Sequence, residues 1–198
     1  MTAPSPTDPW LERWLPMVVA HADGTAILEL GCGSGRDTRT LAAAGLHVVG
    51  IDLSAEAIEE ARARVPAAEF HCRDIREPFP LVAGTVGVVV ASLSLHYFDW
   101  PETMALAERI RRQLRPGGLL LCRLNSTRDF HHGARPDLEA GADNFYLVDG
   151  FPKRFFDRAA IDRLFASGWR LLSADEQVVE RYQQPKALWE VILERQER

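Results

Sequence analysis

The sequence predicts an α/β fold in which a largely parallel sheet is covered by helices on both faces. Between residues 25 and 124, short apolar runs alternate with helical patterns. The runs are nearly continuous in Val, Ile and Leu, which is typical of strands buried on both faces. At 198 residues the chain fits one domain with a single core.

Residues that begin and end helices set the boundaries of the first elements. Asp8 and Pro9 suit the N-cap and the first position of one helix, and Ser54 suits the start of another. Gly45 and Pro66 suit the positions where helices end. The elements expected in this half are a frayed lead-in over 1–9, a helix over 8–21, a strand over 25–30, a helix over 37–44, a strand over 46–51 and a helix from 54 to 66.

The alternation continues in the second half and is interrupted once. Residues 126–156 are polar and aromatic without clear periodicity, and such a long connection in a compact domain is typically functional, so we expect a lid there. Proline and glycine at 116–118 predict a turn. The other expected elements are strands over 67–72 and 86–92, a helix over 102–114, a strand over 119–124, a helix over 157–166, and strands over 169–179 and 186–193.

Composition and charge argue against several classes of protein. A net charge of -5 does not favour binding to a phosphate backbone, which needs clustered Lys and Arg. Arg109, Arg111, Arg112 and Arg115 do cluster, but at the end of an expected helix, where cations suit the dipole and face water. No apolar run reaches the ~18 residues of a membrane-spanning helix, and residues 1–9 lack a leader pattern. We therefore expect a cytoplasmic protein with neither nucleic acid nor membrane as its partner.

The three cysteines indicate neither a metal site nor a disulfide framework. Cys32, Cys72 and Cys122 are widely separated, and their spacing matches no zinc pattern. Each lies in or beside an expected strand, so we expect small buried side chains rather than catalytic thiols.

An apolar strand runs directly into a glycine loop and then a helix at residues 27–44. Gly31, Gly33 and Gly35 allow positive φ and let the backbone approach a ligand closely. The free N–H groups of the following helix favour a carboxylate or phosphate in the same crevice. In an open parallel sheet, a ligand belongs at this carboxyl end of the strands.

Two cofactors compete for such a loop. A dinucleotide fingerprint needs its third glycine at position 36, where this chain has Arg36; here the third glycine is Gly35. Asp52, which follows the next strand, can accept hydrogen bonds from both hydroxyls of a ribose. NAD and S-adenosylmethionine both contain a ribose, so Asp52 alone does not separate them. A carboxylate that only stabilises the next helix N-terminus is the alternative.

The pattern G-x-G-x-G, with Glu29 two residues before it, resembles motif I of the class I S-adenosylmethionine-dependent methyltransferases. Asp74, after the third strand, is similar to the acidic residue with which that family binds the adenine amine, next to an apolar residue that packs on the ring. An Asx turn at Asp74 is the alternative. The cofactor contacts that the resemblance implies are Glu29, Gly31, Cys32, Gly33, Gly35, Arg36, Asp52, Leu53, Asp74, Ile75 and Ser92.

The resemblance covers about residues 25–125 and implies S-adenosylmethionine as cofactor, with S-adenosylhomocysteine as its product. It also implies a Rossmann-like doubly wound sheet of seven strands, mostly parallel, with a C-terminal antiparallel hairpin and helices on both faces. We expect one methyltransferase domain over 1–198. Its expected parts are an N-terminal helix (1–24), a cofactor-binding core (25–125), a lid or substrate insertion (126–156) and a C-terminal helix and strand pair (157–198).

The end of the fourth strand, from Ser92 to Phe98, is where the family places the reacting methyl group. It lacks the Asn-Pro-Pro-Tyr or Asp-Pro-Pro-Tyr sequence of enzymes that methylate exocyclic amines, which argues against a nucleic acid as acceptor. His96 is a candidate catalytic base, with a packing role as the alternative. The short length and compact layout resemble the small-molecule methyltransferases, including the tellurite-resistance and thiopurine type, so a small-molecule acceptor is expected; residues 35–38 are similar to the loop of the tellurite-resistance branch.

Basic and aromatic residues near the lid are candidates for binding that acceptor. Lys153 and Arg154, between phenylalanines, suit an anionic acceptor group; a solvated turn with the phenylalanines in the core is the alternative. His131 and His132 have no further ligand in register, so no metal is expected. The candidate substrate residues are Tyr97, Tyr146, Lys153 and Arg154.

The predicted function is in-line methyl transfer to an unidentified small molecule, carried out by a monomer or homodimer. One alternative is a nucleotide-dependent oxidoreductase, against which Arg36 and Asp74 count. The other is a non-catalytic regulator that binds S-adenosylmethionine, because it would share the same binding residues.

Overall fold

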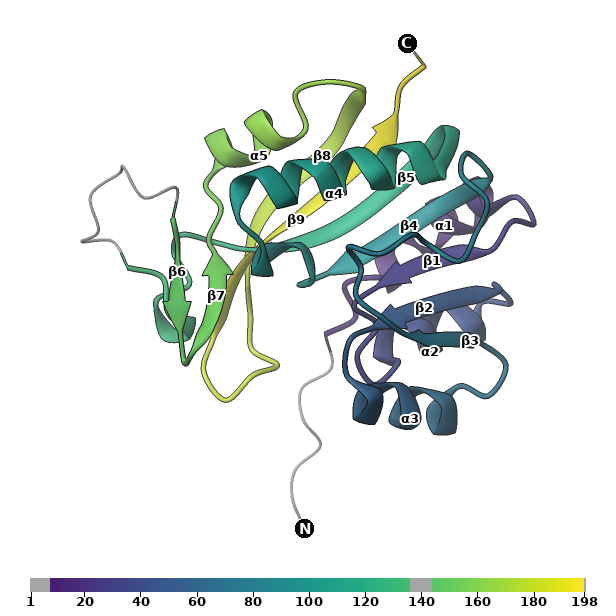
Figure 1. The fold of residues 1–198 in the computed structure, drawn as a ribbon, viewed down its shortest axis with the longest axis horizontal. Coiled ribbons are helices and arrows are strands. Elements are labelled where there is room, and N and C mark those ends of the chain that lie inside the picture. Colours follow the sequence, from purple (N-terminus) through teal and green to yellow (C-terminus); the bar gives the residue numbers. More distant parts are fainter. Residues whose placement is uncertain (1–7, 136–143, 198) are drawn as a thin grey trace.

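Seven strands form one sheet in the computed structural model, in the order β3-β2-β1-β4-β5-β9-β8 (Figure 1). Strands β1 to β5 run parallel to one another, and β9 is antiparallel to both β5 and β8. The structure describes residues 8–135 and 144–197. The strands are β1 Ile27–Leu30, β2 Val48–Asp52, β3 Glu69–Cys72, β4 Val86–Ser92, β5 Leu114–Asn125, β8 Trp169–Val179 and β9 Lys186–Arg195. The predicted fold class, a mostly parallel seven-stranded sheet with a C-terminal antiparallel pair, is confirmed.

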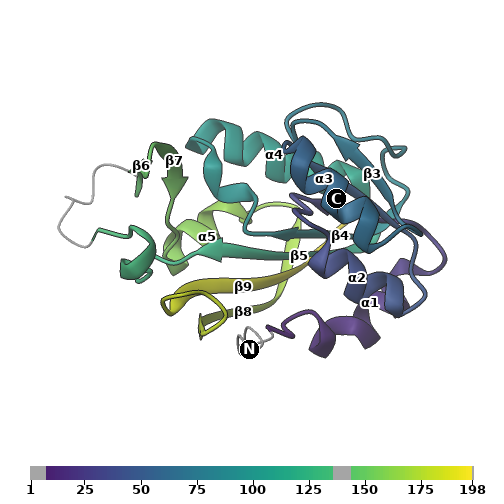
Figure 2. The ribbon, with the colours of Figure 1, turned by 90° about the horizontal axis from the view of Figure 1, so that it is seen from below.

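Helices cover both faces of this sheet. Side chains of α1, α2 and α3 pack on one face, and those of α4 and α5 pack on the other. Figure 2 shows α1 and α4 on opposite sides of β4 and β5. The helices are α1 Leu15–Ala22, α2 Arg36–Ala43, α3 Ala55–Arg64, α4 Trp100–Gln113 and α5 Arg158–Leu164, with short 3-10 turns η1 Glu12–Trp14, η2 Leu95–Tyr97 and η3 Phe130–His132.

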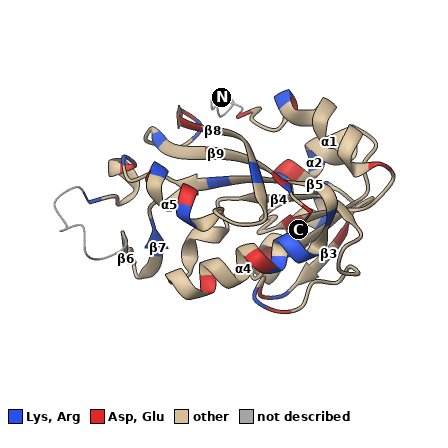
Figure 3. Cartoon of the chain, turned by 90° about the horizontal axis from the view of Figure 1, so that it is seen from above, with Lys and Arg blue, Asp and Glu red and all other residues tan. Residues whose placement is uncertain are grey.

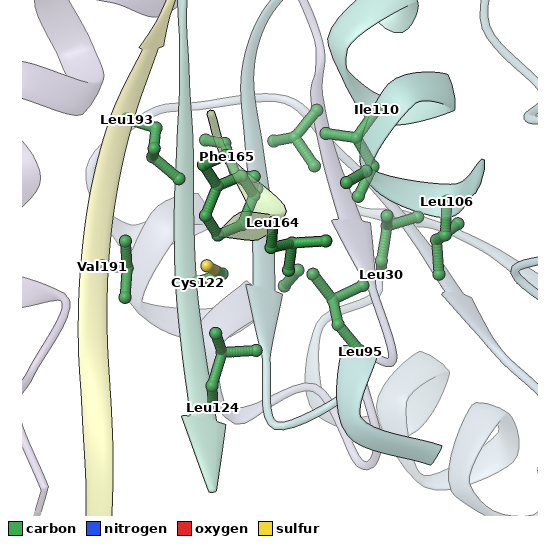
Figure 4. Close-up of a cluster of buried hydrophobic side chains, with 14 of the residues drawn as sticks. Leu30, Leu95, Leu106, Ile110, Cys122, Leu124, Leu164, Phe165, Val191 and Leu193 are labelled. Carbon is green, nitrogen blue, oxygen red and sulfur yellow. The ribbon is translucent and has the colours of Figure 1, made fainter. Parts of the chain in front are cut away.

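The largest cluster of buried apolar side chains lies between α4, α5 and the central strands (Figure 4). Ile110 of α4 and Cys122 of β5 are both fully buried there. Burial raises the pKa of the Cys122 thiol, so it stays protonated and packs as a small apolar group. Cys32 is buried as expected, but Cys72 is exposed, because it ends the edge strand β3. The expectation of three buried cysteines is wrong for Cys72.

Side-chain caps fix the beginnings of three helices. The Ser54 hydroxyl accepts the Ala57 N–H at 3.2 Å, as its position in the sequence predicts. The Asp99 carboxylate accepts the Glu102 N–H at 2.8 Å, so α4 begins two residues before the predicted start. Asp157 accepts the Ala160 N–H at 2.7 Å and begins α5. Each cap satisfies an N–H that the helix itself leaves unpaired.

The N-terminal helix begins later than the sequence predicts. Asp8 does not cap it; the Asp8 carboxylate instead forms an ion pair with Arg123 at the end of β5. Trp10 and Leu11, which the helical pattern includes, are buried against the sheet ahead of the helix. The prediction fails because these tertiary contacts outweigh the local signals at Asp8 and Pro9.

The turn predicted at 116–118 lies inside a strand. Strand β5 begins at Leu114, and its pairing with β4 shifts register between Val86 and Val88. Gly117 has a φ of +73° at this point. The chain therefore makes a bulge in a continuous strand, where the glycine supplies the unusual backbone conformation.

The segment expected to lack regular structure contains an antiparallel pair, β6 Phe145–Val148 and β7 Phe151–Arg154. Asp149 and Gly150 connect the two strands with φ values of +53° and +81°. Positive φ at both positions is the geometry of a two-residue hairpin turn, and Asp-Gly is a strong sequence signal for it. The expectation that 126–156 lack regular structure is wrong for this part. A lid or substrate role of the segment stays a prediction, and 136–143 lie outside the described residues.

The arginine cluster of α4 and β5 does not simply face water. Arg111 is only 7% exposed and pairs with Glu108, while Arg109 donates to backbone carbonyls of the 75–77 loop. Arg115 donates to the carbonyl of His21 at 3.0 Å. Figure 3 shows that α4 carries acidic and basic segments side by side. Arg109 and Arg115 therefore connect different elements, whereas Arg111 and Arg112 pair with Glu108 within α4.

The described residues contain no helix that combines the length and apolar character needed to span a membrane.

Candidate active site

Two adjoining cavities lie at the carboxyl ends of the central strands, where the strand order reverses between β1 and β4. The smaller has a volume of about 540 Å³ and the larger about 1090 Å³. Gly31 and Leu93 line both, so the two spaces meet between the loop after β1 and the end of β4. The smaller cavity is mainly polar in its lining residues, and the larger is mainly apolar and aromatic.

The glycine loop forms the floor between the two cavities. Gly31, Gly33 and Gly35 all have left-handed φ values, of +71°, +52° and +76°. A Cβ on Gly31 would lie 2.5 Å from the Cβ of Ser94, and a Cβ on Gly35 would lie 3.2 Å from that of Ala61. A Cβ on Gly33 would meet nothing within 4 Å. Two of the glycines are therefore required by close packing, and the third keeps the loop open to a ligand.

Asp52, at the end of β2, lines the larger cavity and is joined to the loop. Its Oδ2 accepts the Gly33 N–H at 2.8 Å, and its Oδ1 accepts the Ser54 N–H at 2.9 Å. Each carboxylate oxygen has a second lone pair. The carboxylate therefore keeps capacity to accept two hydroxyl groups from a bound ligand. Leu53, beside it, is exposed and lines the same cavity.

Asp74 lies across the larger cavity, in the loop after β3. Its Oδ1 accepts the Arg76 N–H at 2.8 Å, which is the Asx turn, and the Arg76 guanidinium pairs with the same carboxylate. These hydrogen bonds hold the pKa of Asp74 below its usual range, so the group is ionised. Ile75 is buried and lines the cavity next to it. Asp74 thus makes the turn and also faces the ligand space.

Glu29 is buried beneath the smaller cavity, near the glycine loop. Its Oε2 accepts the Thr38 hydroxyl at 2.5 Å. Burial, together with the charges of Asp37 and Asp52, raises the pKa of Glu29 to about 8. Burial raises the pKa of the Cys32 thiol, so the thiol stays neutral. Only the backbone of Cys32 is therefore expected to bind a ligand.

The smaller cavity contains a group of charged residues that the sequence did not reveal. The Nε of Arg123 donates to the Ser92 hydroxyl at 2.9 Å, and its guanidinium pairs with Asp8. Arg181, from the loop between β8 and β9, lies 3.6 Å from the same Asp8 carboxylate. The Trp10 indole donates to Asp37 at 3.1 Å. The cavity is lined by Arg36, Asp37, Ser92, Arg123, Arg181, Tyr182 and Gln183, besides the glycine loop.

The larger cavity extends from Asp52 and Asp74 towards the β6–β7 pair. Tyr97 and Phe98, after β4, form one wall. Leu93 lies between them and the glycine loop with a φ of +57°, a rare backbone conformation for leucine. Phe145, Phe151, Pro152 and Lys153 from β6 and β7 form the far wall. The sequence had indicated Tyr97 and Lys153 and the segment that contains Leu93 and Phe98, but not Phe145.

His96 is buried below this wall rather than on it. His96 lines neither cavity, and only 4% of the residue is exposed. Burial first, and then the charges of Lys186 and Lys153, lower the pKa of His96 to about 3. A neutral, enclosed imidazole of such low basicity suits packing better than proton transfer. The geometry does not support the predicted role of His96 as a base.

Two of the four candidate substrate residues lie away from the cavities. The Tyr146 ring stacks on Phe155 with 5.3 Å between centroids, and its hydroxyl accepts the Arg135 N–H at 2.7 Å. Arg154 is 2% exposed, with its guanidinium 5.0 Å from the Trp100 ring centroid. Neither residue lines a cavity, so the structure does not bring Tyr146 or Arg154 to the ligand space.

Among the described residues, no group of three His, Cys, Asp or Glu side chains is placed to hold a metal. His132 instead lies 3.2 Å from the carbonyl of Gln184.

Comparisons with known proteins agree with this geometry. Residues 27–118 match the family described as a methyltransferase domain. Trans-aconitate 2-methyltransferase from Paracidovorax citrulli is 36% identical over 104 residues, which cover 52% of this chain and 39% of that protein. An uncharacterised methyltransferase from Synechocystis sp. is 33% identical over 101 residues, 51% of this chain and 47% of its own length. A solved methyltransferase from Methanosarcina mazei has a TM-score of 0.75 at 18% identity, over 92% of this chain and 98% of that one.

The family match overlaps the strands that end at the two cavities. Residues 27–118, just under half of the chain, are therefore similar to a methyltransferase domain. The alternative of an oxidoreductase or a non-catalytic regulator has no support among these matches. The matched part of the chain spans less than half the length of the two curated relatives.

The residues that could hold a cofactor come from four strand ends. Glycines 31, 33 and 35 follow β1, Asp52 follows the core of β2, Asp74 follows β3 and Ser92 ends β4. All of these except Gly35 line the two adjoining cavities. Sequence reasoning found these because each directly follows a recognisable strand.

Proposed function

We propose that the domain binds S-adenosylmethionine across both cavities and transfers its methyl group to a small-molecule acceptor. The observation that carries this proposal is the position of Asp52. Its carboxylate bridges the glycine loop and β2 and keeps free lone pairs towards the larger cavity. A ribose placed there would extend its base towards Asp74 and its other substituent towards the smaller cavity.

In this arrangement the adenosine occupies one end of the larger cavity. Asp52 accepts hydrogen bonds from the two ribose hydroxyls, and Asp74 accepts one from the adenine amine. Leu53 and Ile75, which line the same region, pack against the adenine ring. The ionised state of Asp74, maintained by Arg76, suits an acceptor of hydrogen bonds.

The methionine part of the cofactor occupies the smaller cavity. Its carboxylate is attracted to the N-terminus of α2 and to Arg36, whose side chain is exposed to that space. The backbone of Gly31 and Cys32 and the Ser92 hydroxyl line the path between the two ends. The sulfonium then lies near Leu93, where the two cavities meet.

Methyl transfer is a displacement at the carbon bound to sulfur. A lone pair of the acceptor forms the new bond while the carbon–sulfur bond breaks, and its electron pair stays on the sulfur of S-adenosylhomocysteine. The protein's own task is to align the acceptor behind the methyl group and to exclude water. Tyr97, Phe98 and the β6–β7 residues surround the space available for an acceptor.

The name of one relative supports a small molecule as the methyl acceptor. One relative is named trans-aconitate 2-methyltransferase. Combined with a cavity of about 1090 Å³ that β6 and β7 wall on one side, this favours a small molecule over a macromolecule. A cytoplasmic monomer or homodimer, with no nucleic acid or membrane as partner, stays a prediction, as does a single domain over residues 1–198.

Calorimetric titration with S-adenosylhomocysteine, S-adenosylmethionine and NAD tests the proposal. We expect both adenosyl ligands to bind in a one-to-one ratio and NAD to bind at least ~10-fold more weakly. Tight binding of NAD, with no heat from S-adenosylhomocysteine, would contradict it. Substitution of Asp52 separates this site from any other place of binding.

A further inference from the structure

Lysine is rare in this chain, and both lysines lie near the β6–β7 side of the larger cavity, away from the residues proposed to bind the cofactor. Lys and Arg together number 23, but only Lys153 and Lys186 are lysines. Lys153 is on β7 and lines the larger cavity; Lys186 begins β9. Figure 1 shows the β6–β7 pair beyond the end of β5. Both lysines contribute to lowering the pKa of His96, which lies in η2.

Lys186 already has a partner. Its ammonium lies 2.6 Å from the Asp129 carboxylate, and both groups are buried. The Ala187 N–H donates to the other oxygen of Asp129 at 3.1 Å. This pair fixes the loop after β5, and its charge is neutralised within the protein.

Lys153 has no such partner among the residues that the structure describes. It is half-buried at the cavity wall, with no hydrogen bond or ion pair to another described side chain. The carboxylates that line the same cavity are engaged elsewhere: Asp52 by Gly33 and Ser54, Asp74 and Glu102 by Arg76, and Asp99 by the Glu102 N–H. A half-buried ammonium therefore faces the acceptor space with its charge uncompensated.

The surroundings of Lys153 define the rest of the ligand. Aromatic side chains of Tyr97, Phe98, Phe145 and Phe151 line the same cavity, and flat apolar groups pack well between such rings. The hydroxyl of Ser94, also in the lining, is buried without a hydrogen-bond partner in the described structure. Among the described residues, the cavity thus offers aromatic walls, the unpaired cation of Lys153 besides the paired Arg76, and one unsatisfied hydroxyl.

We propose that the acceptor is an aromatic carboxylate, whose ring packs among these aromatic side chains and whose anionic oxygen binds the Lys153 ammonium. The inference rests on the proposed function, since it places the acceptor beside the cofactor's methyl group. An anionic ligand also suits the burial of His96, because no proton has to be removed from a carboxylate before it binds or reacts.

The test uses 2-naphthoate and the neutral 2-naphthamide, which have the same ring system, as probes of the protein saturated with S-adenosylhomocysteine. Calorimetry or ligand-observed NMR gives both affinities. We expect the wild type to prefer the carboxylate by about tenfold, the effect of one charge-assisted hydrogen bond. Lys153→Met removes the preference while the amide binds as before, and Lys153→Arg retains most of it.

Arg158→Met is the matched control, because Arg158 is exposed on α5 and pairs only with Asp162 among described residues. It should keep the full preference. Equal affinity for the two probes, binding of neither, or an unchanged preference in Lys153→Met would each overturn the inference. These results would leave the cofactor site intact, whereas failure to bind S-adenosylhomocysteine would overturn the proposed function itself.

Discussion

The N–H of Gly33 donates to the Asp52 carboxylate at 2.8 Å. The loop after β1 and the end of β2 are therefore held together by the same group that faces the proposed ribose. A change at either residue acts on the ligand directly and also on the loop that contacts it.

Asp52→Ala should weaken S-adenosylhomocysteine binding by more than about tenfold, about 1.4 kcal/mol. The change removes the hydroxyl acceptor and also releases the N–H groups of Gly33 and Ser54. Asp52→Asn keeps one acceptor oxygen and should lose less. Calorimetry measures both affinities, with Asp162→Ala on the exposed face of α5 as the control. Wild-type affinity in Asp52→Ala would remove this residue from the site.

Gly33→Val should also weaken binding by more than about tenfold, because its side chain would project into open space beside the ligand and its φ of +52° disfavours valine. Gly84→Val is a matched control. Gly84 has a φ of +78° and equally open surroundings, but it lies before β4 and outside both cavities. Both variants should lose stability by thermal denaturation, and only Gly33→Val should lose affinity. Equal affinities would contradict the position of the loop in the site.

Glu29→Gln should change how stability depends on pH. The pKa of Glu29 is raised to about 8 in the folded protein, from 4.5 when unfolded. Between these values the unfolded chain releases the proton first, so this group makes the wild type less stable as pH rises. The contribution is at most about 1.4 kcal/mol per pH unit. Denaturant unfolding from pH 4.5 to 8 should show a smaller decline in the variant; parallel curves would show that Glu29 ionises normally.

His96→Gln should change the pH dependence in the opposite direction. The pKa of His96 is lowered to about 3 in the folded protein, from 6.5 when unfolded. Acidification through this window charges the unfolded chain first, so wild-type stability falls as pH decreases below 6.5. The glutamine variant lacks this contribution. Unfolding measured from pH 4 to 7 should therefore be less acid-sensitive in the variant than in the wild type, and an equal slope would place His96 in contact with water.

The parts of the site that follow strands could be predicted from the sequence. Gly33, Asp52 and Asp74 each come directly after an apolar run, so their shared position follows from parallel pairing alone. Arg123 could not be recognised, because it lies within β5 and its relation to Asp8 spans most of the chain. Such contacts depend on how distant elements pack, and no local pattern records them.

The acceptor wall shows the same limit in another form. The sequence indicated the basic pair Lys153 and Arg154, but only the fold decides which of the two faces the cavity. Arg154 is buried against Trp100 instead. The hairpin itself was within reach, since Asp149-Gly150 is a recognised turn signal that the polar character of the segment obscured.

The contact between Gly31 and Ser94 has a consequence for how the two ligands communicate. A Cβ at Gly31 would lie only 2.5 Å from the Ser94 Cβ. The glycine loop and the segment at Ser94, which lines the larger cavity, are therefore packed tightly against each other. A cofactor that displaces the glycine loop is therefore expected to displace Ser94 in the acceptor space as well. Whatever factor donor binding imposes on acceptor affinity, acceptor binding must impose on donor affinity, because the two equilibria form one thermodynamic cycle.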